Sequence, residues 1–184
     1  MEKMIFITGG VRSGKSSFAE QLAKEKAQKL GGALHYLATG VASDQEMAKR
    51  IARHQREREE SEWSWRTWEQ STGIEAVAES FTSKDIVLLD CVTTLLNNEL
   101  FSQQNWNPQV LTKLLHGIES VQACCAELIL VSNEVLWEGI NHENKLVLEY
   151  SRIIGNLHQV LVARSEKAYL VEAGIPIVMK EEMA

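Results

Sequence analysis

A run near the amino terminus has the residue types and spacing of a phosphate-binding loop. Residues 9–16 read Gly-Gly-Val-Arg-Ser-Gly-Lys-Ser, which fits the pattern G-x-x-x-x-G-K-[ST] at every fixed position. Glycines let backbone N–H groups turn inward onto a phosphate, and the start of a following helix adds partial positive charge. Lys15 would reach the β- and γ-phosphates, and Ser16 would bind Mg²⁺. The pattern predicts a nucleoside triphosphate site; the alternative is a glycine-rich turn in which Lys and Ser occur by chance.

The loop lies between a strand and a helix, as such a site requires. An apolar run at residues 4–8 precedes it, and a helical pattern near 16–30 follows it. Further runs predict strands at 33–38, 86–90, 127–132, 168–172 and 175–179, with helices near 44–60, 73–82, 108–126 and 143–165. Alternating strands and helices predict an α/β fold of the P-loop NTPase type, a mostly parallel sheet with helices on both faces.

Asp90 ends one of these apolar runs and is the second candidate for chemistry. Ligands of open α/β sheets bind at the carboxyl ends of the strands, where both the phosphate loop and Asp90 should lie. A carboxylate there can hold Mg²⁺ beside Ser16, directly or through water. The alternative is a helix cap, if residues 91–100 form a helix. Asn133 and Glu134 leave the next strand and are further polar candidates at this edge.

The helix near 44–60 carries a histidine between two arginines. Arg50, His54 and Arg58 recur at a spacing of four and share one helical face. Neighbouring positive charges disfavour the imidazolium, so the ring stays neutral and can attack phosphorus, while the arginines can hold phosphates. The alternative is a solvated, charged helix.

Tryptophans cluster directly after that helix. Trp63, Trp65 and Trp68 could stack a nucleotide base, and alternation at 63 and 65 suits a short strand. Core or subunit packing is the alternative. Glu69 is a candidate acceptor for ribose hydroxyl groups.

Composition limits the class of protein. The chain has 184 residues, 45% of them hydrophobic, and we expect one domain over 1–184. A net charge of -6 argues against a nucleic-acid surface. No apolar run approaches the roughly 20 residues of a membrane span, and no signal peptide precedes the first strand. Three cysteines form no disulfide framework, and the histidines lack zinc-ligand spacing, so we expect a cytoplasmic protein without a zinc site.

Five motifs together resemble one enzyme family. They are Thr-Gly-Gly-x-Arg-Ser-Gly-Lys-Ser at 8–16, Asp-x-Glu-Met-x-x-Arg-Ile-x-x-His at 44–54, Trp-x-Thr-x-Glu at 65–69, Leu-Leu-Asp-Cys-Val-Thr at 88–93 and Val-Ser-Asn-Glu-Val at 131–135. Their residues and order are similar to the bifunctional adenosylcobinamide kinase / adenosylcobinamide-phosphate guanylyltransferase family of cobalamin biosynthesis.

The resemblance implies a reaction and a set of site residues. The family phosphorylates adenosylcobinamide and then transfers GMP from GTP to the product through a GMP–histidine intermediate, so His54 would be the nucleophile. ATP and GTP would be substrates with Mg²⁺, the corrinoid would be the acceptor, and the enzyme would be a homo-oligomer, with a trimer as the implied form. Lys15 would be catalytic, and Ser16 and Asp90 would hold the metal. The implied nucleotide contacts are Gly9, Gly10, Val11, Arg12, Ser13, Gly14, Lys15, Ser16, Arg50, Glu69 and Asp90.

The chain departs from the family pattern in three segments, residues 58–62, 136–142 and 150–159. Two other functions stay open on the sequence alone. One is a small-molecule kinase without guanylyl transfer, in which His54 is structural. The other is a nucleotide-binding regulator without turnover.

Overall fold

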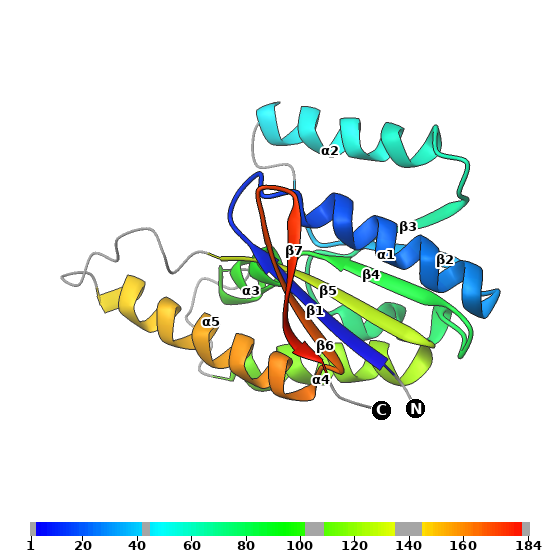
Figure 1. The fold of residues 1–184 in the computed structure, drawn as a ribbon. Helices are drawn as coiled ribbons and strands as arrows, with labels where there is room; N and C mark the ends of the chain where they lie inside the picture. The colour runs from blue at the N-terminus through cyan, green and yellow to red at the C-terminus, as the bar shows by residue number, and fades with distance from the viewer. Residues whose placement is uncertain (1–2, 42–44, 102–108, 135–144, 182–184) are drawn as a thin grey trace.

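The computed structural model describes residues 3–41, 45–101, 109–134 and 145–181, in which strands and helices alternate (Figure 1). Within these residues, the strands are β1 Lys3–Gly9, β2 Leu34–Ala38, β3 Trp65–Glu69, β4 Ile86–Asp90, β5 Glu127–Asn133, β6 Lys167–Glu172 and β7 Ile175–Glu181. The helices are α1 Lys15–Leu30, α2 Gln45–Glu59, the 3₁₀ helix η1 Ile74–Ser80, α3 Val92–Phe101, α4 Val110–Cys124 and α5 Lys145–Arg164.

The strands form one sheet in the order β3-β2-β4-β5-β1-β6-β7. Every neighbouring pair is parallel except β6 and β7, which are antiparallel. The carboxyl ends of β1 to β6 therefore lie at a single edge, which places Gly9, Asp90 and Asn133 on the same side of the sheet. The predicted fold class, a mostly parallel sheet with helices, is confirmed.

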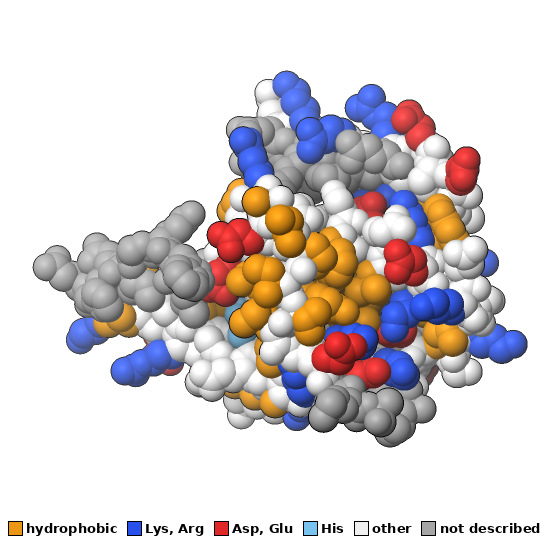
Figure 2. Space-filling model, in the orientation of Figure 1, with side chains coloured by type: hydrophobic (Ala, Val, Ile, Leu, Met, Phe, Trp, Pro, Cys, Tyr) orange, Lys and Arg blue, Asp and Glu red, His pale blue; other side chains and the backbone are white. Residues whose placement is uncertain are grey.

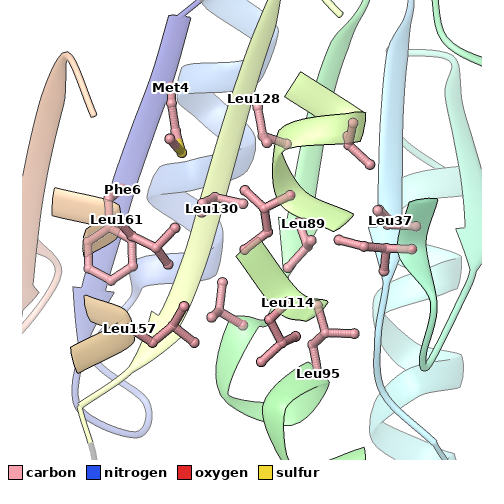
Figure 3. Packing of buried hydrophobic residues seen from close by; sticks show 14 of the residues in the cluster. Met4, Phe6, Leu37, Leu89, Leu95, Leu114, Leu128, Leu130, Leu157 and Leu161 are labelled. Carbon is pink, nitrogen blue, oxygen red and sulfur yellow. The ribbon is translucent and has the colours of Figure 1, made fainter. Parts of the chain in front are cut away.

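Strand alternation divides the core into two layers, one on each face of the sheet. Met4 and Phe6 of β1 join a cluster with α3, α4 and α5, part of which Figure 3 shows. Ile5 and Ile7 face the other way and pack against α1. Helix α1 presents alanines to the sheet, at positions 19, 23 and 27, so its axis can approach the strands closely. Helix α2 lies beyond α1 on that same side (Figure 1).

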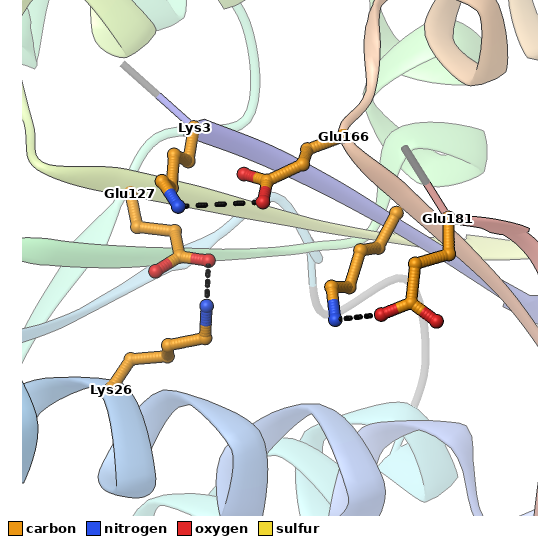
Figure 4. A network of polar contacts seen from close by, with 6 residues as sticks. Lys3, Lys26, Glu127, Glu166 and Glu181 are labelled. Carbon is orange, nitrogen blue, oxygen red and sulfur yellow. Dashed lines mark hydrogen bonds and ion pairs between the residues drawn. The ribbon is translucent and has the colours of Figure 1, made fainter. Parts of the chain in front are cut away.

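Ion pairs hold the amino edge of the sheet, away from the phosphate loop (Figure 4). Lys26 of α1 lies 2.6 Å from the carboxylate of Glu127, which is 1% exposed at the start of β5. Lys3 pairs with Glu166 at 3.3 Å, and Lys167 pairs with Glu181. A buried carboxylate needs such a partner, because burial without one is costly.

Apolar side chains of β7 form an exposed surface. Ile175, Ile177, Val178 and Met179 are 42–65% exposed, and Figure 2 shows hydrophobic side chains gathered in the middle of this face. Pro176 lies on this edge strand, as predicted, where a missing N–H is tolerated. Among the described helices, none is long and apolar enough to cross a membrane.

Several observed helices differ in type or position from those that the sequence predicts. Helix α3 was expected only as an alternative, and residues 74–80 form a 3₁₀ helix where an α-helix over 73–82 was expected. A short connector that leaves Gly73 in the left-handed region and ends at Phe81 suits the tighter 3₁₀ geometry. The predicted helix start at Asn107-Pro108 lies outside the described residues, and α4 is observed from Val110.

Candidate active site at the phosphate loop

The predicted phosphate loop is a compact turn between β1 and α1. Ser13 N–H donates to the Gly10 carbonyl at 3.2 Å, and Phe18 N–H donates to the Gly14 carbonyl at 3.0 Å. Arg12 and Gly14 have φ of 60° and 91°, in the left-handed region. Left-handed residues beside right-handed ones turn successive N–H groups to one side, which makes an anion-binding concavity.

Lys15 is buried rather than exposed as an open loop residue would be. Its side chain folds back so that the ammonium donates to the Gly10 carbonyl at 3.0 Å, and the residue is 7% exposed. Burying a charged lysine is unfavourable unless the ammonium donates to acceptor oxygens. The amine therefore already points across the loop that a phosphate would occupy.

The hairpin of β6 and β7 supports the loop from behind. Gly174 N–H donates to the Ser13 carbonyl at 2.8 Å. A Cβ on Gly9 would lie 2.4 Å from the Val171 carbonyl oxygen, and one on Gly14 would lie 3.2 Å from Gly174 Cα. Close contact with neighbouring backbone therefore favours glycine at positions 9 and 14.

Asp90 lies at the carboxyl end of β4, in register with Ala38 of β2 and Val131 of β5. Its Oδ2 accepts a hydrogen bond from the Tyr36 hydroxyl at 2.9 Å. Tyr36 is 8% exposed, and burial first and then the nearby Asp90 raise its pKa well above the ordinary value. Tyr36 therefore stays a donor at physiological pH and holds the Asp90 carboxylate at the strand ends. Among the described hydrogen bonds, none has Asp90 as a side-chain cap of α3.

Helix α2 carries positions 50, 54 and 58, of which the side chain of Arg58 is described. That side chain is 5% exposed, with its guanidinium carbon 3.7 Å from the centroid of the Tyr36 ring and a nitrogen 4.0 Å from Glu20. The sequence predicts Arg58 as a phosphate contact, but here it packs between α2, α1 and β2. The side chains of Arg50 and His54 lie outside the described residues.

A cavity of about 520 Å³ lies between the second half of α2 and β3. Glu69, predicted as a nucleotide contact, is exposed at its margin and accepts a hydrogen bond from Gln55 at 2.7 Å. The predicted tryptophans all pack against the core: Trp63 and Trp65 on one face of the sheet, where they also line this cavity, and Trp68 on the other face, where it donates to His35 at 3.0 Å. The lining residues are Gln55, Arg58, Ser61, Glu62, Trp63, Ser64, Trp65, Thr67 and Glu69.

A buried chain of hydrogen bonds braces the end of β5 and was missed by the sequence. Asn133 N–H donates to Thr93 Oγ1 at 2.8 Å, Thr93 Oγ1 lies 2.9 Å from Ser132 Oγ, and Ser132 Oγ lies 2.8 Å from His158 Nε2. Because Thr93 accepts from the backbone, the chain is satisfied when each hydroxyl donates onward and His158 accepts. Burial lowers the pKa of His158 to about 4, which keeps it a neutral acceptor.

Among the described residues, no group of three or more His, Cys, Asp or Glu side chains is placed to hold a metal ion. Mg²⁺ does not need such a cage, since it usually keeps waters and takes one or two carboxylates together with phosphate oxygens. Ser16 and Asp90, a hydroxyl and a carboxylate at the same edge of the sheet, fit that requirement.

Comparison with solved structures supports the class of fold that this geometry defines, a mostly parallel α/β sheet with a loop of the P-loop type between its first strand and first helix. The ATPase domain of G40P matches with a TM-score of 0.58 at 13% identity, over 98% of this chain and 77% of that one. The flagellar accessory protein FlaH from Methanocaldococcus jannaschii matches with a TM-score of 0.50 at 15% identity, over 99% and 80%. Identities this low carry the fold alone.

Sequence comparison then gives the family. The model of the cobinamide kinase / cobinamide phosphate guanyltransferase family matches residues 5–179, and the chain belongs to that family, as its motifs predict. The bifunctional adenosylcobalamin biosynthesis protein CobU of Escherichia coli is 35% identical over 96% of this chain and 99% of its own length. CobP of Pseudomonas aeruginosa, with the same description, is 37% identical over 96% of each chain.

The two loop glycines give a matched test of the phosphate loop. Gly9→Ala should destabilise the fold by roughly 1–3 kcal/mol, because its Cβ meets backbone that cannot move aside. Gly10→Ala should leave stability nearly unchanged, since a Cβ there meets nothing within 4 Å. Urea unfolding of both variants measures the difference, and equal stabilities would contradict the packing of Gly9 against the hairpin.

The half-buried His158 predicts a stability that falls in acid. The pKa of His158 is about 4 in the fold and ordinarily near 6.5, so its contribution is complete above pH 6.5 and is lost as pH falls toward 4. The loss should be on the order of 2 kcal/mol, since the ring is partly solvated and each pKa unit is worth at most about 1.4 kcal/mol.

His35 is also buried, and burial lowers its pKa, so the test must be differential. Unfolding of wild type and His158→Gln between pH 7 and 4.5 should show a shallower decline in the variant. His116→Gln, at an exposed position of α4, should decline like wild type. Parallel curves for wild type and His158→Gln would refute the assignment.

Proposed function

We propose that this chain phosphorylates adenosylcobinamide and then transfers GMP from GTP onto adenosylcobinamide phosphate, through a covalent GMP adduct of His54. The observation that carries the proposal is the match to the kinase / guanyltransferase family over residues 5–179, which includes an intact phosphate loop. Relatives described as bifunctional match over nearly the whole chain, which supports both activities.

In the kinase step the phosphate loop binds the triphosphate. Backbone N–H groups of residues 9–16 would surround the β-phosphate, and the Lys15 ammonium would leave the Gly10 carbonyl to bind the γ-phosphate. Arg12, exposed at the rim, would contact phosphate oxygens. Ser16 and Asp90 would hold Mg²⁺, which when bound neutralises charge on the phosphate oxygens. The corrinoid hydroxyl then attacks the γ-phosphorus, and the nucleoside diphosphate leaves.

In the guanylyl step the proposed nucleophile is His54 of α2. A neutral imidazole nitrogen attacks the α-phosphorus of GTP, the P–O bond to the β-phosphate breaks, and pyrophosphate leaves. A phosphate oxygen of the corrinoid then attacks the same phosphorus and frees the imidazole. Covalent catalysis of this kind splits one difficult transfer into two easier ones. Arg50, one turn before His54, would hold the α-phosphate.

The cavity between α2 and β3 is the proposed place for the guanosine part. Its volume of about 520 Å³ and its two tryptophans suit a flat base, and Glu69 at its margin offers a carboxylate to ribose hydroxyl groups. The core interpretation holds for all three tryptophans, and only Trp63 and Trp65 also line the cavity where a base could stack.

We further propose that the enzyme works in the cytoplasm as a homo-oligomer, with a trimer as the expected form. The exposed apolar side chains of β7 support subunit packing there.

The adduct is the feature that separates this function from a plain small-molecule kinase. After incubation with α-³²P GTP, wild type should retain label that is labile to acid and stable to base, as a phosphoramidate is. His54→Ala should retain none, while it still transfers the γ-phosphoryl group to adenosylcobinamide. His116→Ala, an exposed histidine of α4, is the matched control and should label like wild type.

Equal labelling of wild type and His54→Ala would show that another residue is the nucleophile. Absence of label in wild type, with kinase activity present, would favour the small-molecule kinase.

A further inference from the structure

Helix α2 is attached to the rest of the molecule through a small set of described side chains. Arg58 reaches Tyr36 and Glu20, and Gln55 reaches Glu69. A cavity of about 520 Å³ lies beside these contacts, so apolar packing does not fill the space between α2 and the edge of the sheet. Among the described side chains of α2, Arg58 and Gln55 are therefore two that help to set the orientation of the helix.

The Arg58 contact continues to the phosphate-loop edge through one residue. The guanidinium lies over the face of the Tyr36 ring, and the hydroxyl of the same ring donates to Asp90 Oδ2 at 2.9 Å. Tyr36 is fixed by β2, which pairs with β4 in a register that sets Ala38 opposite Asp90. A single aromatic side chain thus joins α2 to the carboxylate proposed to hold Mg²⁺.

The charge of Arg58 is not explained by stability. Among the residues that the structure describes, its Nε and Nη1 are buried without a hydrogen-bond partner, and Nη1 lies 4.0 Å from Glu20 Oε1. Burying unpaired N–H groups is unfavourable, and an apolar side chain of similar size would cover the same ring without that cost. A guanidinium in this place is suited to fixing the orientation of α2, because it lies over the Tyr36 ring while its charge is near Glu20.

We propose that Arg58 and Tyr36 are positioning residues for guanylyl transfer. They hold α2, which carries His54 one turn before Arg58, in a fixed relation to Asp90 and hence to the nucleotide bound there. This inference rests on the proposed function in taking His54 as the nucleophile. Small displacements of a reacting group can slow a reaction by orders of magnitude. A loosened α2 should therefore slow adduct formation at His54. Transfer of the γ-phosphoryl group should continue, because it needs no nucleophile from α2.

A double-mutant cycle tests the link. The variants are Arg58→Met, Tyr36→Phe and the pair together, with Arg56→Met, an exposed arginine of the same helix, as the control. The measurements are the rate of label uptake from α-³²P GTP, the rate of γ-phosphoryl transfer to adenosylcobinamide, and hydrogen exchange of the α2 backbone.

Arg58→Met should slow label uptake by about tenfold or more, slow γ-phosphoryl transfer far less, and speed hydrogen exchange in α2. Arg58→Lys should restore part of the rate, because an ammonium can also lie on the ring. Tyr36→Phe should slow label uptake with α2 exchange unchanged, since the ring stays and only the bond to Asp90 is lost. The double variant should be no slower than Arg58→Met, because both changes break one chain.

Other results would overturn the proposal. One is label uptake at the wild-type rate in Arg58→Met. A second is a fall in the rates of both transfers in proportion to the loss of stability. A third is a double variant whose loss of labelling rate is the sum of the two single losses. If wild type takes up no label, the proposed function fails, and the exchange measurement alone decides the link. In that case faster α2 exchange in Arg58→Met supports it, and unchanged exchange contradicts it.

Discussion

The close approach of three backbone segments at the phosphate loop is the constraint on which the site depends. Gly9 has no room for a Cβ beneath the Val171 carbonyl, and Gly14 packs against Gly174 at the turn between β6 and β7. Gly174 also donates to Ser13 within the loop. The turn between β6 and β7 therefore supports the loop conformation through its own backbone. Strand β7, although exposed, is part of the hairpin that forms this turn.

A second consequence of the fold is that rigid and loosely attached parts meet at one edge. The loop, Asp90 and Asn133 stand on strands whose side chains are buried on both faces of the sheet. Helix α2 instead stands beyond α1, beside a cavity, and its described contacts are those of single side chains. This division suits a two-step enzyme, because the triphosphate would be held by backbone while the proposed nucleophile, His54, would be carried by a helix whose position depends on side-chain contacts.

The nucleotide half could be predicted from the sequence because its signals are local. The loop glycines, Lys15 and Ser16 follow one another in the chain, and Asp90 ends an apolar run, so strand ends alone bring them to one edge. The family also follows from five ordered motifs. Tyr36, Ser132 and His158 could not be found in this way. Their roles depend on register between β2 and β4, and on α5 crossing β5, which no spacing in the sequence encodes.

Some local features also needed the fold. The motif predicts that Lys15 reaches the phosphates, but it does not show that the side chain is buried or that its ammonium donates to the Gly10 carbonyl. Arg58 shares a helical face with position 54 in the sequence pattern, yet the ring of Tyr36 attracts its guanidinium away from solvent. One signal was available for His158: it falls in the segment 150–159, where the chain departs from the family pattern.

We propose that one phosphate loop holds the triphosphate in both transfers, and Lys15 tests this claim most directly. Lys15→Met keeps the length of the side chain and removes the ammonium that points across the loop. Both γ-phosphoryl transfer to adenosylcobinamide and covalent labelling from α-³²P GTP should fall by on the order of 100-fold or more, with the folded state retained. Near-wild-type rates in either reaction, in a variant shown by circular dichroism to be folded, would contradict a shared site.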